Sequence, residues 1–245
     1  MRVCAAAYRG GEMKRPRYID RPALTLTVVL VFALGVALVE PARASDAPGE
    51  FTVARLKYRG GGDWYANPTA LPNLLAALRA RTDLEVAGRP VNVAPDDEEL
   101  LLHPFVHMTG HGKVAFSDDE VDALRDYFER GGFLWADDNY GMDRHFRQQL
   151  DRLLPGSPMV ELPFDHEIYH SFYEFPEGLP KIHEHDGGPP HGYGVFLDGR
   201  MVVFYTFNTD IGDGLEDPEV HNDPPETREA ALRMAINIVV YALSH

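Results

Sequence analysis

The chain has 245 residues, a formal net charge of −15 and a single cysteine, Cys4. Residues 45–245 hold 16 of the 23 basic and 35 of the 38 acidic side chains, so this part carries a charge of −19. Nucleic-acid affinity comes mostly from phosphate neutralisation by Lys and Arg, so this acidity argues against nucleic-acid binding. Because no cysteine follows Cys4, this part also has no thiolate nucleophile and no disulfide.

Residues 1–44 have the pattern of an export signal. Basic residues precede an uncharged apolar run, Ala23–Val39, and small residues follow at Ala42 and Ala44. This order is typical of a secretory signal peptide cleaved after Ala44. The alternative is an uncleaved inner-membrane anchor, although the run is shorter than the ~20 apolar residues that a spanning helix prefers. We therefore expect an exported, periplasmic protein that contacts a membrane only if this segment is retained.

The first half of residues 45–245 alternates between strand and helix patterns. Alternating apolar residues predict a strand that ends at three glycines, and a leucine stripe then predicts a helix. Ser117 and Glu120 have the spacing of a capping box at the start of a later helix. The expected elements are strands at Phe51–Tyr58, Val91–Val93, Phe105–Met108 and Phe133–Ala136, with helices at Asn67–Arg81, Asp96–Leu101, and Ser117 to Gly131.

The second half contains a long segment without periodicity. A helix at Asp143–Leu154 and a strand at Met159–Leu162 precede the stretch from Pro163 to Gly194, which is rich in Pro, Gly, His and aromatic residues. Loops of this length are usually functional or disordered. Asp198 and Gly199 then predict a hairpin between Val195–Leu197 and Met201–Phe207, and Glu226–Leu243 closes the chain as a helix.

This alternation predicts a single α/β domain over residues 45–245, a three-layer sandwich on a mostly parallel sheet with a C-terminal hairpin and closing helix. Three strands are mainly apolar and bounded by polar turns, as expected of parallel strands buried on both faces. We expect Phe51–Tyr58, Phe105–Met108 and Phe133–Ala136 to be these central parallel strands.

Six segments in one order resemble a bacterial family named domain of unknown function 4159. They are YRGGGDWYANP (58–68), HPFVHMTGHG (103–112), GGFLWADD (131–138), DHEIYHSFY (165–173), DGRMVVFYTFNTDIGDG (198–214) and NIVVYAL (237–243). The resemblance implies a fold similar to class I glutamine amidotransferases and flavodoxin-like proteins, and a membrane-associated setting in the cell envelope. It supplies no activity. The chain departs from the amidotransferases because residues 45–245 contain no G-x-C-x-G or G-x-S-x-G nucleophile elbow.

Polar turns follow three of the predicted parallel strands and mark a candidate site. Ligands of open α/β sheets bind beyond the carboxyl ends of the strands. We therefore expect one crevice, with a ligand-binding set of Gly61, Asp63, Trp64, Gly110, His111, Asp138 and His170. His166 or His170 from the long loop is expected to close over it.

Each candidate in this crevice also has a structural interpretation. Asp137 and Asp138 can supply a carboxylate for a cation or for proton transfer, or they can cap a helix. Adjacent residues of a strand point in opposite directions, so at most one of the two faces the crevice. A glycine turn with Trp64 packed on the sheet edge is the alternative for residues 60–64.

The histidines offer a second kind of site. His183, His185 and His191 lie in a Gly- and Pro-rich tract that can bind a divalent metal or be solvated polar loop. His107 is expected on a buried sheet face. The carboxylates of Asp210, Asp213 and Asp217 lack the spacing and the terminal Glu of a calcium-binding EF-hand.

Two functions remain open. The first is a non-catalytic envelope module that binds a small ligand or a partner, such as another protein of an envelope or membrane complex. The second is a hydrolase that uses a divalent metal or an Asp/His pair, with catalytic candidates Asp137, Asp138, His111 and His166. The absence of a nucleophile elbow favours the first.

Overall fold

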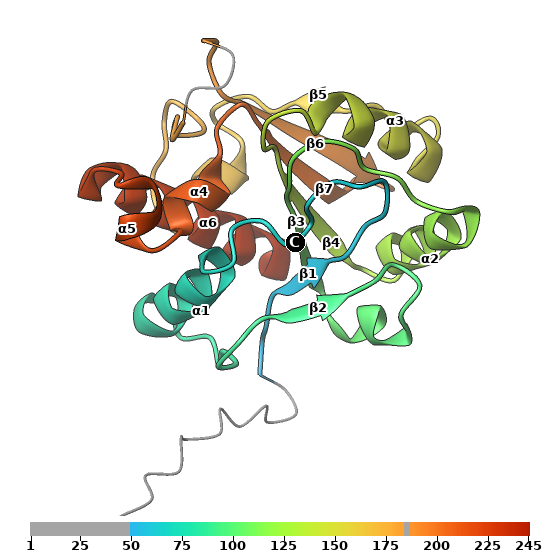
Figure 1. The fold of residues 1–245 in the computed structure, drawn as a ribbon, viewed down its shortest axis with the longest axis horizontal. Helices are drawn as coiled ribbons and strands as arrows, with labels where there is room; N and C mark the ends of the chain where they lie inside the picture. The colour runs from blue at the N-terminus through green and yellow to red at the C-terminus, as the bar shows by residue number, and fades with distance from the viewer. Residues whose placement is uncertain (1–49, 184–186) are drawn as a thin grey trace, which may run out of the picture. The chain divides into compact units, whose positions relative to one another are not determined.

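A seven-stranded sheet in the order β2-β1-β3-β4-β7-β6-β5 forms the centre of the molecule (Figure 1). The computed structural model describes residues 50–183 and 187–245, and the expected export signal lies outside them. Five strands run parallel, and β6 is antiparallel to both of its neighbours. The strands are β1 (Ala54–Leu56), β2 (Val91–Val93), β3 (Phe105–Met108), β4 (Phe133–Asp137), β5 (Val160–Glu161), β6 (His191–Leu197) and β7 (Arg200–Phe207).

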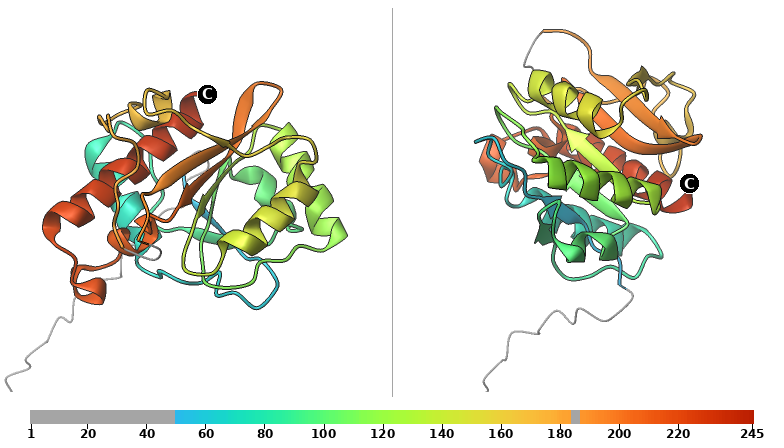
Figure 2. Two further views of the ribbon diagram at one scale, coloured as in Figure 1. Left: turned by 90° about the horizontal axis from the view of Figure 1, so that it is seen from above. Right: turned by 90° about the vertical axis from the view of Figure 1, so that its right-hand side faces the viewer.

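Helices cover both faces of the sheet and give the expected three layers (Figure 2). One face packs against α1 (Ala70–Arg81), α4 (Ile211–Leu215) and α6 (Pro225–Ser244), and the other against α2 (Asp118–Glu129) and α3 (Asp143–Leu153). A short helix, α5 (Pro218–His221), and two 3₁₀ helices, η1 (Glu98–Leu102) and η2 (Glu167–Tyr169), lie in the connections. The sheet separates two apolar cores, one on each face.

The central strands form where the sequence predicted them. Every residue of β3 and β4 is buried, and β1, β3 and β4 pair in parallel. Ser117 caps α2: its hydroxyl accepts from Glu120 N, and the Glu120 carboxylate accepts from Ser117 N at 2.7 Å. Asp198 and Gly199 both have positive φ, which is the geometry that a two-residue hairpin turn requires.

Some elements differ from the sequence predictions, notably β1, β6 and two short helices. β1 covers only Ala54–Leu56, because Phe51 and Arg59 form isolated bridges with residues outside β2 and β3. β6 begins at His191 instead of Val195, within the segment expected to be irregular. Helices α4 and α5 were not expected, since each is a single short turn with no measurable periodicity.

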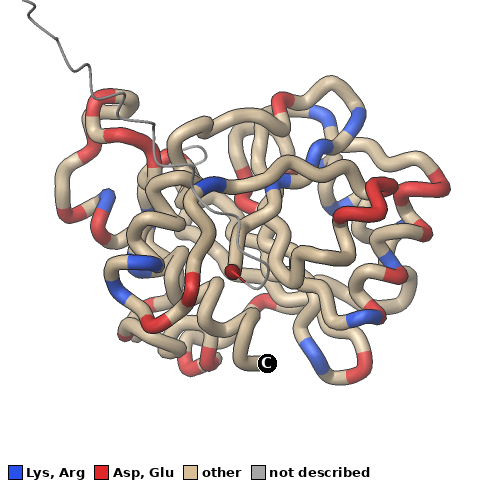
Figure 3. The backbone as a smooth tube through the Cα atoms, turned by 90° about the horizontal axis from the view of Figure 1, so that it is seen from below, with Lys and Arg blue, Asp and Glu red and all other residues tan. Residues whose placement is uncertain are grey.

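Acidic and basic residues are interspersed over the part of the chain that the structure describes. In the view of Figure 3, Asp and Glu lie along many elements, with Lys and Arg among them. Among the described residues no helix combines the length and apolar character needed to cross a bilayer.

Candidate functional site

The order of the parallel strands places a topological switch point between β1 and β3. The chain leaves β1 towards β2 on one side, and leaves β3 towards β4 on the other. Ligands of open α/β sheets bind at such a point, beyond the carboxyl ends of the strands. The segments that follow β1 and β3, residues 57–64 and 109–112, therefore frame the candidate crevice.

These two segments meet through Asp63 and His111. The Asp63 carboxylate accepts a hydrogen bond from His111 N, and its Oδ2 lies 3.0 Å from His111 Nδ1. The imidazole is about half exposed. A carboxylate at Nδ1 fixes the ring orientation and leaves Nε2 directed elsewhere, which is the arrangement of an oriented base.

Gly110 lets the two segments approach each other. Its φ is +140°, and a Cβ at this position would lie 2.1 Å from Tyr58 Oη and 2.9 Å from the Asp63 carbonyl oxygen. Any other residue would clash with both. The glycine in the Gly-His-Gly turn is thus required for the contact between the β1 and β3 segments.

Two aspartates at the end of β4, Asp137 in its last position and Asp138 directly after it, have different roles. Asp137 is fully buried; one carboxylate oxygen accepts from the Thr206 hydroxyl and the other accepts from Gly212 N at 2.6 Å. It therefore joins β4 to β7 and to the first turn of α4. Asp138 is also buried, but its Oδ1 has no hydrogen-bond partner. Asp137 therefore connects β4 to α4, whereas Asp138 Oδ1 is free to form a hydrogen bond with a ligand.

Several buried polar atoms at this edge of the sheet lack partners. Asn139 is 1 % exposed, and neither its amide nitrogen nor its amide oxygen forms a hydrogen bond. The Thr109 hydroxyl is also buried and has no hydrogen-bond partner. Such groups are rare in proteins, because an unmet buried donor or acceptor costs about 1–3 kcal/mol. The full set at these strand ends is Tyr58 Oη, Asn67 Nδ2, Thr109 Oγ1, Asp138 Oδ1, and Asn139 Oδ1 and Nδ2.

Burial and neighbouring carboxylates alter the acidity of the aspartates. Burial, and then the charge of Asp143, raise the pKa of Asp138 to about 7. Burial, followed by the charge of Asp210, raises the pKa of Asp137 well above its ordinary value. Asp138 thus exchanges its proton near neutral pH, so it can both donate to and accept from a ligand.

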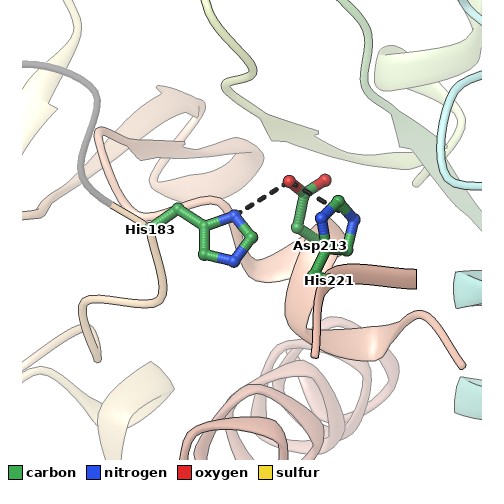
Figure 4. Close-up of side chains that lie close together, drawn as sticks. All are labelled: His183, Asp213 and His221. Carbon is green, nitrogen blue, oxygen red and sulfur yellow. Dashed lines mark hydrogen bonds and ion pairs between the residues drawn. The ribbon is translucent and has the colours of Figure 1, made fainter. Parts of the chain in front are cut away.

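A second polar cluster lies beyond the end of β7. His183 Nδ1 is 2.9 Å from Asp213 Oδ2, and His221 Nε2 is 3.6 Å from the same oxygen. One donor atom of each side chain lies within 4.8 Å of those of the other two (Figure 4). The hydrogen bond with Asp210, together with Asp223 and Asp213, raises the pKa of His183 to about 10.

The expected closure of the crevice by His166 or His170 is not found. The His166 ring lies 5.5 Å from that of Tyr241 in the last turn of α6, and Tyr241 contacts Phe133 at the start of β4. This is the amino end of the strands, opposite the crevice. His170 bonds to Glu174 and to the Phe164 carbonyl oxygen. Both imidazoles have local partners that hold them away from Asp138.

The remaining candidates are dispersed. Gly61 is exposed with no atom near its Cβ position, and Trp64 packs on the core that faces α2 and α3. His191 lies in β6 and bonds to Glu161, apart from His183, and His185 lies outside the described residues. His107 is buried on the sheet against Trp135, with ring centroids 4.5 Å apart, as expected.

An open cavity of about 560 Å³ lies beside the long loop and not at the switch point. Phe164, Phe175, Pro189 and Pro190 form much of its wall, and Lys181 reaches from it to the side-chain oxygen of Asn208 at the end of β7. The polar atoms at the strand ends, by contrast, are covered. A ligand of the crevice must therefore be small or must displace the segments above it.

Comparison with known proteins identifies the family. A family model described as Domain of unknown function (DUF4159) matches residues 52–243. The chain belongs to this family. A search of the curated proteins found no match.

The sequence of this DUF4159 domain does not single out Asn139 or His221 and does not connect His183 with Asp213. Asn139 follows the two aspartates directly, but an uncharged amide gives no signal of a site. His221 could have been found, because Asp217 and Pro218 form a typical helix start that places His221 in the last turn of α5. Asp213 gives no metal-site signal in the sequence, because its partner His183 lies 30 residues earlier.

Proposed function

We propose that this DUF4159 protein is a non-catalytic binding module of the cell envelope. Its ligand would lie at the carboxyl ends of β1, β3 and β4. The observation that carries the proposal is the group of buried, unpartnered polar atoms on Thr109, Asp138 and Asn139. A ligand that supplied their hydrogen bonds would remove a cost of about 1–3 kcal/mol for each group.

The chemistry of these atoms defines the ligand class. Thr109 and Asn139 offer donors and acceptors, and Asp138 can serve as either because its pKa is about 7. The carboxylates of Asp63 and Asp210 add acidic groups around the site. A small uncharged or cationic molecule with hydroxyl or amino groups fits this set, whereas phosphates and carboxylates are repelled.

We also assign the scaffold to the amidotransferase-like and flavodoxin-like folds. The parallel strands follow the order β2-β1-β3-β4-β7, which corresponds to the flavodoxin-like order 2-1-3-4-5. Strand β4 ends at Asp137 and is followed by Asp138 and Asn139, so the nucleophile of an amidotransferase has no counterpart there. This supports binding over glutamine hydrolysis.

Thermal unfolding with a panel of small molecules tests the proposal. The panel contains polyols, amines and amino sugars, with inorganic phosphate as the repelled class. We expect a member of the first three classes to stabilise the protein by about 2.7 kcal/mol at one hundred times its Kd. Asn139→Ala should abolish this stabilisation. Asn92→Ala, which removes an exposed amide on β2, should preserve it.

Two results would contradict the binding module. One is that no panel member shifts the unfolding of the protein. The other is that a ligand stabilises the Asn139→Ala variant as much as the unmodified protein, which would place its site elsewhere.

A hydrolase that depends on the Asp63–His111 pair is the second candidate. The observation in its favour is the 3.0 Å contact between Asp63 Oδ2 and His111 Nδ1 at the switch point. With its ring oriented in this way, a neutral His111 could take a proton from water through Nε2. Asp138, after the end of β4, would be a further acid–base group, because burial raises its pKa to about 7.

Assays with chromogenic ester and phosphoester substrates test this alternative. Turnover that falls at least ~100-fold in His111→Gln, and stays unchanged in His170→Gln, would support it. The His170 variant is a matched control, because that imidazole also bonds to a carboxylate, that of Glu174. Turnover that is equal in the two variants would exclude the Asp63–His111 pair as its source.

A further inference from the structure

We propose that His183, Asp213 and His221 bind a zinc ion. They come from three segments: His183 lies in the long loop, Asp213 in α4 and His221 at the end of α5 (Figure 4). The proposal is independent of the ligand in the crevice, since it uses different residues. It also replaces the metal set expected from the sequence, of which only His183 is retained.

The spacing of the donor atoms suits tetrahedral zinc. Ligand atoms at about 2.0–2.1 Å from zinc on a tetrahedron lie about 3.3 Å from one another. Asp213 Oδ2 is 2.9 Å from His183 Nδ1 and 3.6 Å from His221 Nε2. Both separations are within a few tenths of an ångström of the tetrahedral value. The rings of the two histidines are 5.0 Å apart, centroid to centroid, and form the sides of the site.

The Asp223 carboxylate hydrogen-bonds to the second ring nitrogen of His183. His183 Nε2, on the far side of the ring from Asp213, lies 2.9 Å from Asp223 Oδ1. Histidines that bind zinc usually donate their second ring N–H to a carboxylate or carbonyl, which fixes the tautomer and orients the ring. An ion-paired histidine needs only one carboxylate. His183 has a carboxylate at each ring nitrogen, Asp213 at Nδ1 and Asp223 at Nε2. A zinc site explains both, with Asp213 as a ligand of the ion and Asp223 as the hydrogen-bond partner of the ring.

The donor types select the metal. Two imidazoles and one carboxylate are the set found in many zinc sites with three protein ligands. Magnesium and calcium prefer oxygen donors and would bind this set poorly. Asp210 Oδ2 lies 3.5 Å from His183 Nδ1, so a further carboxylate is at hand beside the ion.

Zinc at this position would tie together segments that the chain connects only through loops. The side chains of His183 and His221 are 26 % and 30 % exposed, so the ion can enter from solvent. Asp213 belongs to α4, whose Gly212 N donates to Asp137 at the end of β4. The ion would thereby hold α4 and the long loop over the carboxyl edge of the sheet.

Metal analysis and titration test the proposal on the protein as purified from cells. After treatment with EDTA, titration with zinc chloride should give one zinc per chain by calorimetry. Cobalt(II) in place of zinc should produce the strong visible absorption of a tetrahedral complex. Asp223→Asn should weaken zinc binding by about 10–100-fold, and His221→Gln, which removes a ligand, should weaken it further. His170→Gln, outside the cluster, should leave it unchanged.

The metal-free protein provides the control for folding. His221 is partly exposed and its contact with Asp213 is long, so the metal-free His221→Gln variant should keep the circular dichroism and unfolding temperature of the unmodified protein. Zinc should raise the unfolding temperature of the unmodified protein and not of the variant. Absence of stoichiometric zinc, or equal zinc affinity in His221→Gln, would overturn the proposal. The cluster would then be an ion-pair network around a protonated His183.

Discussion

Asp137 and Asp138 show how two adjacent residues of the same type acquire different roles. The end of an extended strand directs their side chains to opposite sides. Asp137 reaches the Thr206 hydroxyl and Gly212 N, whereas Asp138 Oδ1 is buried without a partner. The sequence predicted that at most one of the two faces the crevice. It could not show which one, because the partner of Asp137, Gly212 N at the start of α4, lies 75 residues further along the chain.

The pKa of Asp138 predicts a stability that falls as pH rises. The folded-state pKa is about 7, whereas an unfolded aspartate has a pKa of about 3.9. Between these values the folded chain holds a proton that the unfolded chain has lost. The contribution of Asp138 is therefore present below about pH 4 and is lost as pH rises to 7. The free energy of unfolding, relative to that of Asp138→Asn, should fall by up to ~1.4 kcal/mol per pH unit in this window.

Urea unfolding at several pH values between 4 and 8 measures this difference. Asp165→Asn, at an exposed carboxylate in the long loop, is the control, and its curve should run parallel to that of the unmodified protein. If the Asp138→Asn curve is also parallel, Asp138 is ionised in the folded state throughout. Its role as both donor and acceptor for the proposed ligand would then be ruled out.

At the scale of elements, the parallel strands could be predicted and the short helices could not. β3 and β4 are continuous apolar runs between polar turns, a pattern that burial on both faces imposes. The capping box at Ser117 fixed the start of α2 in the same way. Helices α4 and α5 have five and four residues, too few for an amphipathic period, and are held by contacts such as that of Asp137 with Gly212.

The candidate site was predictable only as far as strand ends could be located. Because parallel strands end at the same edge of the sheet, the sequence predicted that Asp63 and His111 lie at one crevice, and the structure places the two side chains in contact. The positions of His166 and His170 did not, since nothing in an aperiodic loop indicates which end of the sheet it crosses. The partners of His183 come from elements that the sequence did not reveal.

The bond from Asp137 to α4 predicts a large loss of stability on its removal. Asp137→Ala leaves Gly212 N and the Thr206 hydroxyl, both buried, without this acceptor. Each such group costs about 1–3 kcal/mol, so the variant should lose about 2–4 kcal/mol in the free energy of unfolding at pH 7. Asp138→Ala is the matched control and should lose less than Asp137→Ala, since its Oδ1 has no partner and only its contacts with Tyr205 and the Asn208 backbone are removed. Equal losses in chemical denaturation would show that both aspartates are structural.

At the scale of the whole molecule, charge and cysteine content fit an exported domain. The only cysteine precedes the proposed cleavage position, so a processed chain would rely on its two apolar cores alone for stability. The basic residues before Ala23 contrast with the charge of −19 carried by residues 45–245. This asymmetry matches a signal peptide in front of an acidic domain, and leads to a prediction about processing.

We expect the protein in the cell envelope to begin at Ser45. Signal peptidases require small residues at the positions represented by Ala42 and Ala44, so Ala44→Asp should block cleavage and leave the longer chain. Ala47→Asp introduces the same charge three residues later and should leave processing intact. N-terminal sequencing and the mass of each variant measure the outcome. If the unmodified chain keeps its first 44 residues and resists carbonate extraction from membranes, the apolar run is an anchor, and the domain acts at a membrane surface.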